Sequence, residues 1–159
     1  ESSIKRQPVL SVTGYLQEMV ETSHKNLSAY AAREWAASLT LIAFQGDSFY
    51  LATAGPSFIN LYEEGKIYDI PHASRDTLGT GVALGRPGDF VVHVAYQDFT
   101  EDNSLLISWQ GLKSLINSEE LSALFDRGSE IASRNLYRLI NDESEFALLM
   151  VSKQDDGEG

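Results

Sequence analysis

Apolar side chains recur at helical spacing in the first part of the chain. Within residues 12–35, positions such as Leu16 and Val20 fall on one side of a 3.6-residue period, and no proline interrupts the stretch. The spacing predicts a long amphipathic helix over 12–35. Gly14 and the Ser-His pair at 23 and 24 are weak helix formers, so one helix and two consecutive helices both fit the pattern.

Short runs of apolar and β-branched residues follow, separated by turn residues. Residues 38–45 and 48–55 flank a Gly-Asp pair, and residues 58–71 hold two shorter runs around a Glu-Gly pair. Pairs of this kind favour tight hairpins, so the pattern predicts a meander of four antiparallel strands. Residues 72–89 contain many glycines and few apolar side chains, which is typical of a long loop.

The second half of the chain mixes strand and helix patterns. Residues 90–97 and 105–109 are predicted strands joined by an acidic connection. One helix is expected to open at Ser118, where glutamates occupy the first turn, and another to span 129–140. A last strand is predicted within 145–153. Separate runs of strands and helices indicate an α+β fold with an antiparallel sheet covered by helices on at least one side.

Composition limits the classes of function. The chain has 159 residues, with 12 basic and 23 acidic side chains and a formal net charge of −11, which argues against nucleic-acid and lipid partners. We expect a single domain over 1–153, an acidic tail or linker over 154–159, and neighbouring domains beyond both ends. No apolar run approaches the roughly 20 residues of a membrane helix. The lack of cysteine excludes disulfides and thiolate metal sites and fits a cytoplasmic location.

Three longer phrases, taken in order, resemble the type 2C, metal-dependent serine/threonine protein phosphatases. They are ASLTLIAFQGDSFYLATAGPSFINLYEEGKIYDI, LLISWQGLKSLINSEEL and RNLYRLINDESEFALLMVSK. The resemblance runs from about Leu16 to Lys153. It implies an antiparallel β-sandwich of two stacked sheets flanked by helices, truncated at the N-terminus because the opening strands of the family have no counterpart.

The family's metal-binding positions are degenerate under this resemblance. Gln110 stands where the family has the aspartate of Ser-Asp-Gly, and Pro56 replaces the aspartate of a Gly-Asp-Ser-Arg phrase. Ser144 aligns with the aspartate of a late Asp-Asn phrase, although a shift of that alignment by a residue brings in Asp142 or Glu143. Two hard divalent cations need several converging carboxylates, and an amide oxygen carries no charge to offset them.

We therefore expect a non-catalytic phosphatase-like domain of a larger protein, acting in protein–protein interaction or signal regulation without a cofactor. The partner is another protein or a neighbouring domain, and Trp109, Phe58 and Phe99 are the candidate partner-binding residues; the alternative for these aromatics is the core. One alternative function is a phosphoprotein phosphatase whose missing front segment completes a manganese or magnesium site. Another is a small-molecule sensor that uses the emptied cleft.

Other candidate sites are weaker. His93 alternates with valines in a predicted strand, so we expect it to be a structural residue of the sheet rather than a metal ligand or a catalytic base. His24 and His72 are expected to be exposed. The glycines of 79–85 do not match the dinucleotide-binding spacing, and an acidic loop at 98–102 lacks the spacing of a helix-loop-helix calcium site. The missing opening strands predict an uncovered sheet edge, closed by homodimerisation or by the loop 72–89.

Overall fold

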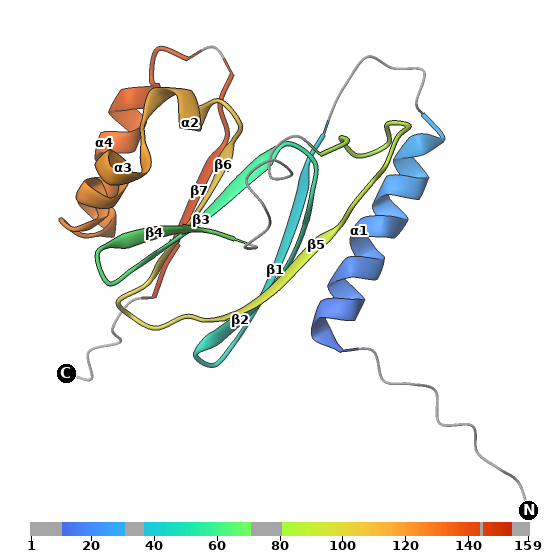
Figure 1. Cartoon of the computed structure of the whole chain (residues 1–159), viewed down its shortest axis with the longest axis horizontal. Coiled ribbons are helices and arrows are strands. Elements are labelled where there is room, and N and C mark those ends of the chain that lie inside the picture. Colours follow the sequence, from blue (N-terminus) through green and yellow to red (C-terminus); the bar gives the residue numbers. More distant parts are fainter. Residues whose placement is uncertain (1–10, 31–36, 71–80, 144, 154–159) are drawn as a thin grey trace, which may run out of the picture.

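The protein folds as four layers, helix, sheet, sheet and helices, in a computed structural model (Figure 1). The structure describes residues 11–30, 37–70, 81–143 and 145–153. Helix α1 (Val12–Ser28) covers one sheet, and helices α2 (Leu112–Leu115), α3 (Ser118–Phe125) and α4 (Ser129–Ile140) cover the other, with the two sheets stacked between them. The predicted α+β sandwich flanked by helices is confirmed.

Helix α1 spans Val12–Ser28, so the prediction of a helix through residue 35 was too long; residues 31–36 lie outside the described part. The Ser11 side chain caps the start by accepting a hydrogen bond from the Gly14 amide at 3.1 Å. The helix stays continuous through its weak formers. The Ser23 hydroxyl donates to the carbonyl four residues earlier at 2.9 Å, which satisfies that side chain within the helix.

Two antiparallel sheets form the centre of the molecule. The first has the order β1-β2-β5, and the second has the order β4-β3-β6-β7. In chain order the strands are β1 Leu39–Gln45, β2 Ser48–Ala54, β3 Ser57–Glu63, β4 Lys66–Asp69, β5 His93–Asp98, β6 Ser104–Trp109 and β7 Leu148–Ser152. Both predicted hairpins, β1–β2 and β3–β4, are present.

The prediction of one four-stranded meander was wrong, because the two hairpins belong to different sheets. The chain changes sheet at Gly55, whose φ is +90°, in the left-handed region that favours glycine. A Cβ at this position would lie 2.8 Å from both the Ala37 oxygen and the Ser38 Cα. Because only glycine fits this approach, the β2–β3 connection can bend away from the first sheet rather than extend it.

Two other predicted ranges differ at their ends. Regular pairing in β5 begins at His93 instead of residue 90, and β7 begins at Leu148 instead of residue 145. The predicted loop 72–89 falls partly on residues 71–80, which lie outside the described part. In its remainder, Ala83 and Leu84 are buried, and the Leu84 amide donates to the Ala37 carbonyl at 2.9 Å.

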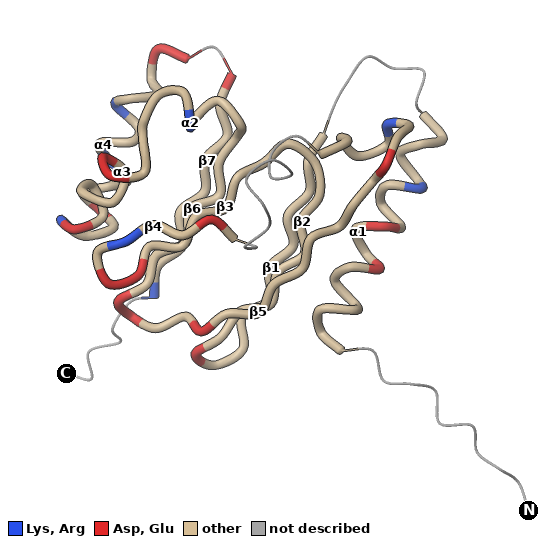
Figure 2. The backbone as a smooth tube through the Cα atoms, viewed as in Figure 1, with Lys and Arg blue, Asp and Glu red and all other residues tan. Residues whose placement is uncertain are grey.

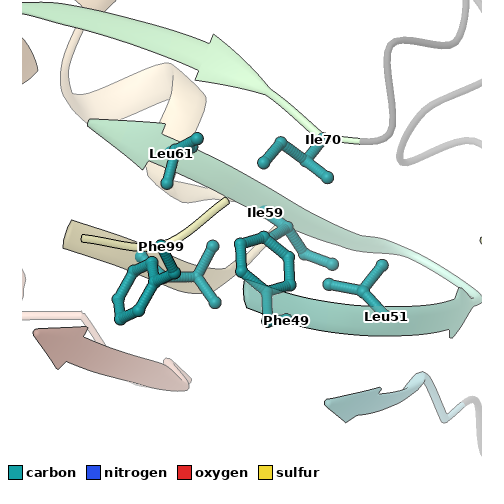
Figure 3. Packing of buried hydrophobic residues seen from close by; sticks show 7 residues of the cluster. Phe49, Leu51, Ile59, Leu61, Ile70 and Phe99 are labelled. Carbon is teal, nitrogen blue, oxygen red and sulfur yellow. The ribbon is translucent and has the colours of Figure 1, made fainter. Parts of the chain in front are cut away.

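The main core lies between the sheets. It consists of side chains that alternate inward along their strands, together with two residues from connections: Phe49, Leu51, Ile59, Leu61, Ile70, Phe99 and Leu105 (Figure 3). Phe49 and Phe99 meet edge to face, with ring centroids 5.8 Å apart. This core ties the two hairpins together.

A second cluster lies on the outer face of the second sheet. It joins Leu106 of β6 to helices α2 (Leu112–Leu115), α3 (Ser118–Phe125) and α4 (Ser129–Ile140). Helix α3 begins at a reciprocal capping box. The Asn117 side chain accepts a hydrogen bond from the Glu120 backbone amide, and the Glu120 side chain accepts one from the Asn117 backbone amide. None of the helices in the described part of the chain is long and apolar enough to cross a membrane.

Candidate functional site

A groove of about 440 Å³ opens at one end of the sandwich, where four segments converge. They are the start of β1, the β2–β3 connection, the end of β6 and the residues that lead into β7. Of the degenerate metal positions, Pro56 lines this groove and Gln110 directly follows Trp109. The groove is lined by Ser38, Leu39, Thr40, Pro56, Ser57, Ile107, Ser108, Trp109, Ala147, Leu148 and Leu149.

None of the described residues that line this groove is charged. Three hydroxyls in and behind its walls contact one another. Thr40 and Thr53 face each other across β1 and β2 with their oxygens 2.8 Å apart, and Ser57 continues the chain of contacts at 3.4 Å. Charged residues lie instead on helices, on turns and at strand ends (Figure 2).

Trp109 forms one wall of the groove. It also packs against the second hydrophobic cluster, between β6 and helices α2 to α4, which we call the helical cluster. Its amide donates to the Ala147 carbonyl at 3.0 Å, and its ring lies 6.4 Å from that of Phe146. The indole lies directly over Gly111. A Cβ built there would overlap Nε1 and would lie 2.9 Å from Cε2. Glycine at 111 is therefore what allows Trp109 to occupy this position.

The degenerate positions have different environments. Pro56 is half-buried in the groove wall, whereas Gln110 is exposed at the end of β6. Ser144 lies outside the described residues, and its neighbours Asp142 and Glu143 are exposed after α4.

The described residues hold no group of three or more histidine, cysteine, aspartate or glutamate side chains suited to a metal ion. The uncharged hydroxyls and amide among the described residues at this end do not match the anionic oxygen ligands that a two-metal centre requires.

The three candidate aromatics do not form one surface. Phe58 is 8% exposed, and the Lys113 ammonium lies 3.8 Å from its ring centroid. Phe58 pairs in register with Ser108, whereas Ser57 pairs with Trp109. Phe99 is 3% exposed in the core between the sheets. Of the three, only Trp109 lines the groove. Phe99 is absent from it because the connection that carries this residue enters the core.

Strands β1 and β7 are edges of their sheets and both flank the groove. Neither strand contains a charged residue, whereas the other two edge strands do: β4 has Lys66 and Asp69, and β5 has Asp98. At the far end from the groove, the Lys153 ammonium contacts the Asp47 carboxylate in the β1–β2 turn. The two uncharged edges therefore lie on the same side of the sandwich.

On the outer side of the second sheet, a tyrosine hydroxyl bonds to a carboxylate. The Tyr62 hydroxyl donates to Asp126 Oδ1 at 2.6 Å, and this hydrogen bond, reinforced by burial and by the negative charge, raises the pKa of Tyr62. The ring of Tyr62 stacks on Phe125 at 5.3 Å. This contact fastens the end of α3 to β3.

The sequence reasoning missed the role of His24. Expected to be exposed, it is half-buried; its Nδ1 accepts the Gly85 amide at 3.1 Å, and its ring stacks on Phe90 at 3.7 Å. Gly85 has a φ of +76° and approaches Leu27 closely. These contacts fasten the segment before β5 to α1.

Comparison with known proteins establishes the fold. Stp1, a serine/threonine phosphatase from Staphylococcus aureus, superposes with a TM-score of 0.71 at 11% identity, over 94% of this chain and 72% of that protein. The S. agalactiae serine/threonine phosphatase gives 0.70 at 10% identity, over 92% and 74%. The catalytic domain of PstP, solved with two manganese ions, gives 0.68 at 15% identity, over 93% and 74%.

No protein-family model matches the sequence, and no curated protein is significantly similar to it. At the identities above, the likeness carries the fold alone. The chain has the fold of the bacterial serine/threonine phosphatases of the 2C type, as the sequence resemblance predicted.

Proposed function

We propose that this phosphatase-like domain is a non-catalytic binding module of a larger protein, and that it binds an extended segment along its β1 and β7 edges. The observation that carries the proposal is the uncharged groove between these edges, with Trp109 and Leu149 in its walls. The segment belongs to another protein or to a neighbouring domain. We place the module in the cytoplasm, in signal regulation.

The edge strands favour strand addition. Proteins usually protect an exposed edge with charged residues or proline, and β1 and β7 have neither. Each edge offers unpaired backbone groups, and Leu149 of β7 is 56% exposed. An added strand gains main-chain hydrogen bonds from the edge, and the adjacent groove accepts alternate side chains.

The charge of the chain indicates the partner's chemistry. With a net charge of −11, the domain attracts a segment that combines apolar residues with basic ones. The same charge disfavours nucleic acid. The groove is uncharged, so its contribution is apolar contact, and the basic side chains of the segment would contact the surrounding surface.

The non-catalytic part rests on the chemistry of the groove wall. Phosphatase chemistry through divalent metals requires anionic ligands that hold the ions and lower the pKa of bound water. Gln110 and Pro56 supply no charge, and Trp109 adds an apolar ring. These residues suit apolar contact better than a hydrated cation.

Site-specific photo-crosslinking tests the binding function. A photoreactive residue replaces Leu149 at the edge or, as a control, Leu139, which is 40% exposed on α4. We expect crosslinks to one partner segment from position 149 and none from 139, and we expect Leu149→Lys to abolish co-purification of that partner. Equal crosslinking from both positions would contradict the proposal.

An activity assay tests the non-catalytic part separately. We expect no hydrolysis of an aryl phosphate or a phosphopeptide with manganese or magnesium. Metal-dependent turnover would establish the phosphatase alternative instead. A rise in melting temperature with phosphorylated metabolites would favour the sensor alternative. A dimer that Leu149→Lys dissociates would identify a second copy as the occupant.

A further inference from the structure

A second cavity, of about 270 Å³, lies on the outer side of the second sheet, beneath the connection between α2 and α3. Its polar residues come from neighbouring strands: Asn60 of β3 pairs in register with Asp69 of β4, and Ser108 of β6 pairs with Phe58, two residues before Asn60 on β3. Apolar walls are supplied by Leu112 and Leu121. Ser108 is the one residue that this cavity shares with the groove between β1 and β7.

Ser108 is the unusual member of this set. It is 3% exposed, and its Oγ is the one buried side-chain oxygen or nitrogen of the described residues without a hydrogen-bond partner. Because side chains alternate along a strand, Ser108 shares the face of Leu106, which packs in the helical cluster. A buried hydroxyl without a partner costs free energy that a bound polar group would recover.

The rim of the cavity carries one charge of each sign. Lys113 Nζ lies 3.4 Å from Asp69 Oδ2, and Asn60 donates to the other oxygen of that carboxylate at 2.7 Å. Lys113 also lies over the Phe58 ring. The charges therefore cancel at the entrance, and neither an anion nor a cation is favoured by the pair.

We propose that this cavity binds a small, uncharged, polyhydroxylated molecule of the monosaccharide or polyol class. Adjacent hydroxyls of such a molecule both donate and accept, which matches the alternating carboxylate, ammonium, amide and hydroxyl groups of Asp69, Lys113, Asn60 and Ser108. Its C–H faces fit the leucine walls, and the volume suits a ligand of about six to twelve heavy atoms, at the small end of natural ligand sites.

Amide NMR titration of the folded domain tests this site, with myo-inositol, D-glucose and D-ribose as probes and with the inorganic phosphate anion and the zwitterion glycine betaine as comparisons. We expect saturable shifts at the amides of Asn60, Ser108 and Lys113 with at least one neutral probe. Ser108→Ala is expected to weaken that binding about tenfold, as loss of one buried hydrogen bond implies. The matched control is Ser104→Ala, a buried serine of the same strand outside the cavity, which should change binding less than about twofold.

The outcomes are separable. Absence of saturable shifts with all three neutral probes, stronger binding of phosphate, or unchanged binding in Ser108→Ala would each overturn the proposal. If Ser108→Ala does not fold, Lys113→Met removes a rim donor at an exposed position and is expected to cause a comparable loss. Strand addition is tested separately through Leu149→Lys, because Leu149 does not line this cavity.

Discussion

Replacement of Gly111 by alanine tests how Trp109 is held in the wall of the groove. Residue 111 has a φ of −65° and a ψ of −21°, a conformation that alanine adopts without strain. By backbone entropy alone, Gly111→Ala would stabilise the protein by about 0.4–1 kcal/mol. The added methyl, however, would occupy the space of the indole at Nε1 and Cε2.

The magnitude follows from these opposed effects. Forcing a methyl group into filled space typically costs about 1–3 kcal/mol. We therefore expect Gly111→Ala to lower the free energy of unfolding by a net amount of about 1–2 kcal/mol, after subtraction of the entropic gain. For a domain of this size, each kcal/mol corresponds to about 2–4 °C in the melting temperature.

Urea unfolding and tryptophan fluorescence measure both consequences, in a background where the other tryptophan, Trp35, is replaced by phenylalanine. Displacement of the indole into water should shift its emission to longer wavelength. In a Trp109→Ala background the clash is absent, so Gly111→Ala should become neutral or stabilising. If Gly111→Ala stabilises the protein with Trp109 present and leaves the emission unchanged, the reasoning is refuted.

Three further substitutions test the Tyr62 contact, the helical cluster and the groove. Because the folded-state pKa of Tyr62 is raised above 10.0, the stabilising effect of its neutral hydroxyl is present below pH 10 and is lost as the pH rises through the folded-state pKa. The difference in unfolding free energy between wild type and Tyr62→Phe should therefore shrink in that pH range, which denaturant titrations at several pH values would measure. Leu136→Ala, at a fully buried position in the helical cluster, should destabilise the domain by about 2–5 kcal/mol in urea unfolding, and a smaller loss would show that the cluster is loosely packed. Gln110→Asp should not create micromolar manganese affinity in calorimetry, because the groove offers no second carboxylate; such affinity would contradict the donor set described here.

Local patterns in the sequence were sufficient for the hairpins. The β3–β4 turn places Glu64 and Gly65 at positive φ, and this turn chemistry is visible in the residue pair itself. The assignment of each hairpin to a sheet was not predictable in this way. It depends on the approach of Gly55 to Ala37, two residues that belong to different elements.

The site was predictable only in part. Resemblance led to Trp109 and Pro56, which do line one groove. Phe99, grouped with Trp109 as a candidate aromatic, packs in the core because the β5–β6 connection crosses between the sheets. The contact of His24 with Gly85 joins residues far apart in the chain, and no periodic pattern around either residue indicates it.

The β5–β6 segment has a consequence for how the chain folds. Its two strands complete different sheets: β5 adds to the first hairpin, where Ser48 pairs with Asp98, and β6 adds to the second, where Ser57 pairs with Trp109. Each hairpin closes over a short turn, but these later pairings join residues about fifty positions apart, so chain entropy delays them. The segment must pair with both hairpins before the core between the sheets can close. We therefore expect its docking to be the rate-limiting step of folding. The expected folding time is milliseconds to seconds rather than microseconds.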